Sequence, residues 1–267
     1  MSRRSRALHP LSVLWVLAAG LLGLSVSPTA SAACERNEPG YLWNFDGAIA
    51  EKYPVRMTLV FSGDTLEGVY TYRSQLRDIR LRGRIDGGKT VVLDELDAAG
   101  RVTARFEGEF VTRDPKGRYG DSELACEVIV GSWGKVGASE RLSVYLGTEG
   151  ATAGSLKHRY GTIGVRDDEV VHRGAARFWR AVKAGDRATV AAQVRYPTAV
   201  TLDGKVRRLT GPKDLLTVYD AVFTPKFVGA ILESTPRYMF VRDQGAMLGS
   251  GWVWFGADGK VTALNNF

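Results

Sequence analysis

The sequence predicts an α+β protein in which an antiparallel β-barrel or curled meander of about eight strands precedes a cone-shaped α+β domain. From Gly40 to about Thr148, apolar and polar residues alternate in short runs separated by Gly, Asp and Ser, which is typical of antiparallel strands. After about Ala151 the apolar residues recur at helical spacing. With 267 residues, of which 45% are hydrophobic, the chain can bury a core in each half.

The first half contains eight alternating runs, each with one apolar and one more polar face. In the second run Val55, Met57 and Leu59 lie on the same apolar face. Local connections between such runs favour an up-and-down barrel. The expected strands cover residues 40–46, 53–62, 65–73, 77–86, 89–96, 101–112, 122–133 and 140–147.

A weak internal repeat places a glycine between two large apolar residues within four of these strands. The glycines are Gly68, Gly83, Gly108 and Gly131. Glycine inside a strand marks a bend or a close approach of two backbones, as small barrels require. We therefore interpret the repeat as architectural.

Three arginines alternate along one expected strand. Arg80, Arg82 and Arg84 share a face with no apolar residue, which favours a solvated outer surface over an anion-binding site. We expect cross-strand pairing of these arginines with acidic residues of neighbouring strands, namely Asp94, Glu107 or Glu109.

The second half begins with helices and ends with strands. Val171, Ala175, Phe178 and Val182 share a helical face, and Gly185 ends this helix as its cap. The other expected elements are a short helix capped by Asp186, a hairpin through Asp203-Gly204, a helix from Pro212 through Phe223, a shorter helix that starts at Thr224-Pro225, and strands near 237–243, 246–249, 251–256 and 260–266.

The N-terminus is typical of a secretory signal peptide. Arg3, Arg4 and Arg6 precede an apolar run over residues 11–24, and small residues lead to Ala32. Cleavage after Ala32 removes the three arginines and lowers the formal net charge from +7 to +4. We expect a bacterial periplasmic or secreted protein with no membrane span in its mature chain and, since no basic stripe remains, no nucleic-acid partner.

The chain contains two cysteines. Export would place Cys34 and Cys126 where disulfides form, and two thiols can pair in only one way. We expect a bridge between them. The alternative is lipidation of Cys34, against which Ser31 stands where a lipoprotein signal normally has Leu.

Three stretches of the second half resemble a known superfamily. They are residues 178–186, residues 219–225, and residues 242–245 followed by 251–255. With the order of elements, they resemble the nuclear transport factor 2-like superfamily of cone-shaped domains. The resemblance implies a cone that binds a ligand or a protein, less often an enzyme such as ketosteroid isomerase, and makes a homodimer plausible.

The first half looks generically like a ligand-binding calycin barrel. The expected organisation is a signal peptide over 1–32, a barrel-like domain over 33–150, a linker over 151–167 and a cone domain over 168–267.

No catalytic motif emerges from the sequence. The mature chain has two His residues, His158 and His172, and no cluster with the spacing of metal ligands, so we expect no metal or other cofactor. A Gly-x-Ser-x-Gly elbow and a phosphate-binding loop are also missing from the sequence.

What remains is a pocket hypothesis for the cone. An apolar bowl with a few polar groups is the usual form of a small-ligand site. The candidate ligand-binding residues are Tyr219, Asp220, Arg242, Asp243, Trp252 and Trp254. The alternative is that the two tryptophans only fill the core and that Arg242 and Asp243 form a structural ion pair.

The leading functional hypothesis is a non-enzymatic exported module that binds a small ligand or an envelope partner. The alternative is a small-molecule isomerase, dehydratase or hydrolase that uses Asp220 or Asp243 as its base. A third hypothesis is protein inhibition or envelope assembly through an exposed sheet face.

Overall fold

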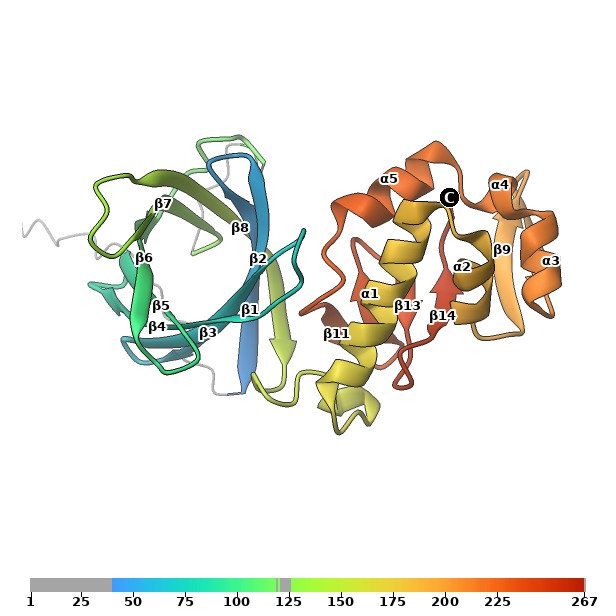
Figure 1. Ribbon diagram of the computed structural model, residues 1–267, viewed down its shortest axis with the longest axis horizontal. Coiled ribbons are helices and arrows are strands. Elements are labelled where there is room, and N and C mark those ends of the chain that lie inside the picture. Colours follow the sequence, from blue (N-terminus) through green and yellow to red (C-terminus); the bar gives the residue numbers. More distant parts are fainter. Residues whose placement is uncertain (1–39, 119, 121–125, 267) are drawn as a thin grey trace, which may run out of the picture. The chain divides into compact units, whose positions relative to one another are not determined.

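The computed structural model describes residues 40–118, 120 and 126–266, which all belong to one compact unit. Its first eight strands form a closed antiparallel barrel in chain order, and β8 pairs with β1 (Figure 1). The strands are β1 (Tyr41–Ile49), β2 (Tyr53–Ser62), β3 (Thr65–Tyr72), β4 (Ile79–Asp86), β5 (Thr90–Leu96), β6 (Val102–Phe110), β7 (Val128–Lys135) and β8 (Leu142–Ala153). The predicted barrel is thus confirmed.

The inside of the barrel is filled by side chains. Phe45, Met57, Leu59 and Tyr70 are completely buried there. The void between Met57 and the neighbouring apolar side chains measures about 10 Å³, no more than a single water needs. The described residues therefore leave no room for a ligand in the apolar core of the barrel, where the likeness to calycin barrels predicts a pocket, because an eight-stranded barrel is just wide enough for its side chains.

The repeated glycines mark close contacts between backbones, as predicted. Gly108 of β6 and Gly131 of β7 lie opposite each other. A Cβ atom added to Gly108 would lie 2.5 Å from the carbonyl oxygen of Val130, and one added to Gly131 would meet that of Glu107. Gly68 also approaches a carbonyl of its partner strand too closely for a side chain.

Gly108→Ala is expected to lower the free energy of unfolding by about 1–3 kcal/mol, because the strands must separate to admit the methyl group. Urea denaturation of the purified protein measures the change. Gly229→Ala is the control, since nothing lies within 4 Å of its added Cβ and alanine favours the helix that contains it. Equal losses in both variants would contradict the close-contact explanation.

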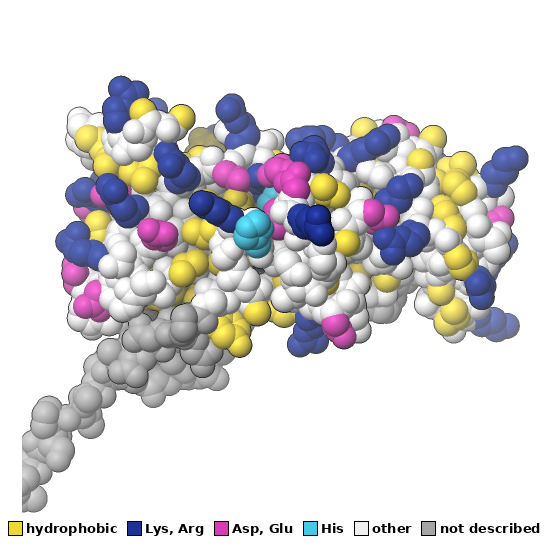
Figure 2. All heavy atoms as spheres, turned by 90° about the horizontal axis from the view of Figure 1, so that it is seen from below, with side chains coloured by type: hydrophobic (Ala, Val, Ile, Leu, Met, Phe, Trp, Pro, Cys, Tyr) yellow, Lys and Arg dark blue, Asp and Glu magenta, His cyan; other side chains and the backbone are white. Residues whose placement is uncertain are grey.

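Charged side chains cover the outside of the barrel in pairs, and Figure 2 shows both signs interspersed on the visible face. The expected pairing of the arginines on β4 is wrong. Arg84 instead pairs along its own strand with Asp86, at 2.9 Å. The acids expected as partners bind other cations, in the pairs Lys89–Glu109, Arg105–Asp94 and Arg141–Glu107.

Helices and two small sheets follow the barrel, which confirms the α+β class. Four strands in chain order form one antiparallel sheet, and two form a hairpin. The elements are η1 (Gly161–Ile163), α1 (Asp168–Ala184), α2 (Arg187–Gln193), β9 (Thr198–Leu202), β10 (Lys205–Leu209), α3 (Pro212–Thr217), α4 (Tyr219–Val222), α5 (Pro225–Glu233), β11 (Phe240–Arg242), β12 (Gly245–Leu248), β13 (Val253–Phe255) and β14 (Val261–Leu264).

Caps define the ends of these helices. Gly185 ends α1 in the left-handed conformation at φ +67, and the Asp186 side chain accepts a hydrogen bond from the Thr189 amide at the start of α2. The helix expected from Pro212 through Phe223 is interrupted at Val218, between α3 and α4. The Thr217 hydroxyl donates to the Asp214 carbonyl and so competes with helical hydrogen bonding at this point.

A second core lies between α1 and the four-stranded sheet. Phe178 of α1 and Phe255 of β13 are fully buried and meet edge to face, with ring centroids 5.7 Å apart. Among the described residues, no helix has the length and apolar character that crossing a bilayer requires. The expected signal peptide and Cys34 lie outside the described residues, so the signal peptide and the Cys34–Cys126 pairing stay predictions.

Candidate functional site

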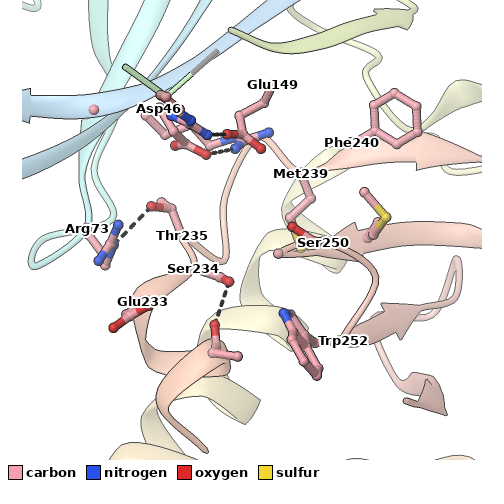
Figure 3. A pocket seen from close by; sticks show the side chains of 16 residues that line it. Asp46, Arg73, Glu149, Glu233, Ser234, Thr235, Met239, Phe240, Ser250 and Trp252 are labelled. Carbon is pink, nitrogen blue, oxygen red and sulfur yellow. Dashed lines mark hydrogen bonds and ion pairs between the residues drawn. The ribbon is translucent and has the colours of Figure 1, made fainter. Parts of the chain in front are cut away.

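A cleft of about 610 Å³ lies where the barrel meets the segment from α5 to β13 (Figure 3). One wall comes from β1, β2, β8 and the loops that follow β3 and β6. The other comes from the end of α5, from β11 and β12, and from the turn before β13. Residues far apart in sequence therefore build it together.

Two arginines on the barrel wall are paired with carboxylates. The Arg56 guanidinium binds Asp46 at 2.5 Å and donates to the carbonyl oxygen of Tyr238 at 2.6 Å. Arg118 forms an ion pair with Glu149. Because each charge has a partner, these pairs add little net charge to the cleft.

A third arginine on this wall has no carboxylate partner. Arg73 follows β3, where its backbone amide donates to the carbonyl of Pro54 at 3.0 Å. Its half-buried guanidinium donates only to the hydroxyl of Thr235, at 3.4 Å, among the described residues. Burial lowers the pKa of Arg73, and the charges of Asp46 and Glu233 oppose that shift without contacting the guanidinium.

The opposite wall has an apolar part beside polar side chains, which are Glu233, Ser234, Thr235 and Ser250. Met239, Phe240, Met247 and Trp252 line it, and Figure 3 shows Trp252 across from the barrel side chains. Trp252 is half-buried and packs edge-on against Phe227, with ring centroids 6.0 Å apart. Methionine and aromatic side chains adapt to apolar ligand surfaces of varied shape.

A buried arginine holds the backbone of this wall. Arg159 is completely buried and donates to the carbonyls of Tyr238 and Met239, both at 2.9 Å, and to the side chain of Asn44 on β1. Burial lowers its pKa to about 10. These bonds fix Met239 and Phe240 against the barrel.

A buried histidine supports the same segment from α1. The Tyr238 amide donates to Nε2 of His172 at 3.4 Å, so the proton of the neutral ring is assigned to Nδ1, which lies 3.2 Å from a carboxylate oxygen of Glu169. Glu169 also binds Arg237 at 2.5 Å, and Arg237 binds Asp78 in the loop between β3 and β4. Burial lowers the pKa of His172.

Two sequence candidates lie on α4, outside the cleft. Tyr219 stacks on Phe223 with centroids 4.4 Å apart, beneath the guanidinium of Arg187. Asp220 is exposed and forms a two-point ion pair with Arg187, at 2.7 and 2.9 Å.

The other candidates lie on the terminal sheet. Arg242 and Asp243 are exposed at the turn between β11 and β12, where Asp243 accepts from the Gln244 amide and Arg242 lies over the ring of Phe240. Trp254 is half-buried on β13. Of the six candidates, only Trp252 lines the cleft, so the structure does not gather them as the pocket hypothesis expects.

Sequence reasoning missed Arg73, Thr235 and the paired residues Asp46 and Arg56. Alternation along β2 assigns Arg56 to the outer face of the barrel, yet it is only 6% exposed because the segment after α5 covers it. Asp46 and Arg56 are cross-strand partners. Their ion pair could have been predicted from the sequence only if the register of the two strands had been known.

No protein-family model, curated protein or solved structure matches this chain. The resemblance to the nuclear transport factor 2-like superfamily therefore stays a prediction. The cleft is interpreted from its own geometry.

Proposed function

We propose that the protein is an exported, non-enzymatic module that binds a small molecule in the cleft. One observation carries the proposal: a cavity of about 610 Å³ combines the apolar side chains of Met247 and Trp252 with charged groups on the barrel wall. This volume lies within the roughly 300–1,000 Å³ of typical ligand sites, which are mostly apolar with a few convergent polar groups.

The groups that line the cleft favour binding over chemistry. Asp46 and Glu149 each hold an arginine, so neither is poised as a general base. The alternative enzymatic hypothesis named Asp220 or Asp243 as base, and both carboxylates are exposed outside the cleft. No specific observation favours an isomerase, dehydratase or hydrolase.

The fold and location belong to the same proposal. Residues 168–267 would be a cone of the nuclear transport factor 2-like type, supported by two helices ahead of an antiparallel sheet and by the packing of Phe178 on Phe255. Export would follow cleavage after Ala32, and a Cys34–Cys126 bridge would form in the oxidising compartment.

The test uses the neutral fluorescent probe N-phenyl-1-naphthylamine on the mature protein. We expect it to bind, and we expect Trp252→Ala to weaken binding about tenfold, because the variant removes the largest apolar surface of the cleft. Trp254→Ala is the matched control, since this half-buried tryptophan lies nearby but does not line the cleft. Absence of binding, or equal weakening in both variants, would refute the proposed site.

A further inference from the structure

We infer that the ligand of this cleft carries an anionic group, which binds Arg73 and Thr235, and an apolar part, which lies against Trp252 and Met247. The inference rests on the proposed function and adds the chemical class of the ligand. Its first basis is that the three arginines of the cleft differ in their ion-pair partners.

Arg56 and Arg118 each have a carboxylate within ion-pair distance, whereas Arg73 has none among the described residues. Its single hydrogen bond, from Nε to Thr235, leaves both terminal nitrogens of the guanidinium without a described acceptor. A planar guanidinium with two free nitrogens matches a carboxylate or a phosphate through paired hydrogen bonds.

The position of Arg73 strengthens such a contact. Half-burial has removed part of the water around its guanidinium, and a charge that loses water without gaining a counter-ion is unfavourable. An anionic ligand group would supply the missing counter-ion where the effective dielectric constant is lower than in water. Glu233, the nearby acid without an ion pair among the described residues, is exposed, so solvent screens its charge.

A buried positive charge lies behind the cleft. Arg159 is completely buried, and no carboxylate side chain lies within ion-pair distance of its guanidinium among the described residues. It also donates to the carbonyl of Met239, which lines the cleft. Its field therefore favours an anion over a cation in the cleft.

The apolar side chains of the opposite wall indicate the character of the rest of the ligand. Trp252, Met247 and Phe240 offer no charged group, so they suit an apolar body. The expected ligand is thus an amphipathic anion of small-molecule size. A carboxylate and a phosphate share the required chemistry, and the experiment separates them.

The first arm compares two fluorescent probes with the same apolar body. 8-Anilinonaphthalene-1-sulfonate carries an anionic group that N-phenyl-1-naphthylamine lacks. We expect the wild type to bind the sulfonate about tenfold more tightly than the neutral probe. Arg73→Gln is expected to abolish this preference, so that the two probes bind with similar affinity. Arg84→Gln is the matched control, because it removes an exposed arginine of β4 that does not line the cleft.

The second arm displaces the sulfonate probe with 1-naphthaleneacetate, 1-naphthyl phosphate or 1-naphthaleneethanol. Displacement by either anion at a concentration about tenfold lower than the alcohol requires supports the inference and identifies the preferred anion. Thr235→Val is expected to weaken the anions alone, which provides a second variant if Arg73→Gln folds poorly.

Equal displacement by the alcohol and the anions would overturn the inference. So would an unchanged preference for the sulfonate in both Arg73→Gln and Thr235→Val. If the neutral probe still binds in a Trp252-dependent manner, only the anionic class fails and the proposed function stands. If the neutral probe never depends on Trp252, the proposed function itself fails.

Discussion

Arg237→Met is expected to lower the free energy of unfolding by about 3 kcal/mol, which corresponds to a fall of roughly 6–12 °C in Tm. The reason is the number of partners that depend on this side chain, which is only 11% exposed. Arg237 binds Asp78 of the barrel and Glu169 of α1 at the same time. Burial opposes its charged form, but these hydrogen bonds and charges outweigh burial and raise its pKa.

Methionine would leave two carboxylates near each other without their shared cation, and so would replace attraction with repulsion. Arg237→Lys should recover only part of the loss, because an ammonium lacks the planar fork that reaches both carboxylates. Chemical denaturation followed by circular dichroism measures all three proteins.

The pair of Arg187 and Asp220 provides a matched control for Arg237→Met. Its geometry is as good, with contacts at 2.7 and 2.9 Å, but its side chains are 50% and 79% exposed. Arg187→Met should therefore cost less than about 1 kcal/mol, since water and salt screen exposed ion pairs. A loss as large as that of Arg237→Met would show that burial is not what makes Arg237 important.

The sequence predicts local features of this protein well, because they depend on neighbouring residues. Alternation along β2 and the glycines at 108 and 131 indicated the barrel, and Asp186 and Gly185 marked helix ends at the correct positions. The interruption at Val218 escaped prediction because a side-chain hydrogen bond from Thr217 competes with a pattern that otherwise continues as a helix.

The cleft could not be predicted in the same way. Arg73 and Thr235 are 162 residues apart. Arg73 ends an expected strand and Thr235 lies in an expected loop, so neither stands out in the sequence. Their meeting depends on how the segment after α5 covers the barrel, for which apolar periodicity contains no information. Trp252 was found because a tryptophan must be buried somewhere, whereas Tyr219 and Trp254 satisfy the same rule without lining the cleft.

Acid sensitivity is the second large effect that we expect, and it originates at His172. The neutral ring accepts from the Tyr238 amide and lies edge-on between the rings of Tyr160 and Tyr238. Burial is the main cause of its lowered pKa, and the charge of Arg237 acts in the same direction. Glu169 and Asp78 raise the pKa of His172 and so oppose both effects. Protonation at Nε2 would place two donors against each other and break the bond to Tyr238.

The sign follows from comparing the folded and unfolded chains. As the pH falls below about 6.5, His172 in the unfolded chain binds a proton, whereas His172 in the folded protein stays neutral because its pKa is lower. The unfolded state therefore binds more protons than the folded state, and the free energy of unfolding falls. The slope approaches about 1.4 kcal/mol per pH unit until the lowered pKa of the folded state is reached. Glu169, whose pKa is lowered to about 2 mainly by its hydrogen bond with His172, destabilises the fold further below pH 4.5.

Urea denaturation at intervals from pH 7.5 to 5.0 measures the slope, and two glutamine variants assign it. His172→Gln should flatten the dependence in this window, although it lowers stability at pH 7.5. His158→Gln is the control, because it makes the same substitution at an exposed position in the loop before η1. A slope that persists in His172→Gln would place the acid sensitivity elsewhere. If the slope disappears in His172→Gln, the acid sensitivity originates at His172. Low pH would then act on the segment of Tyr238, whose carbonyl binds Arg56 and Arg159 behind the cleft.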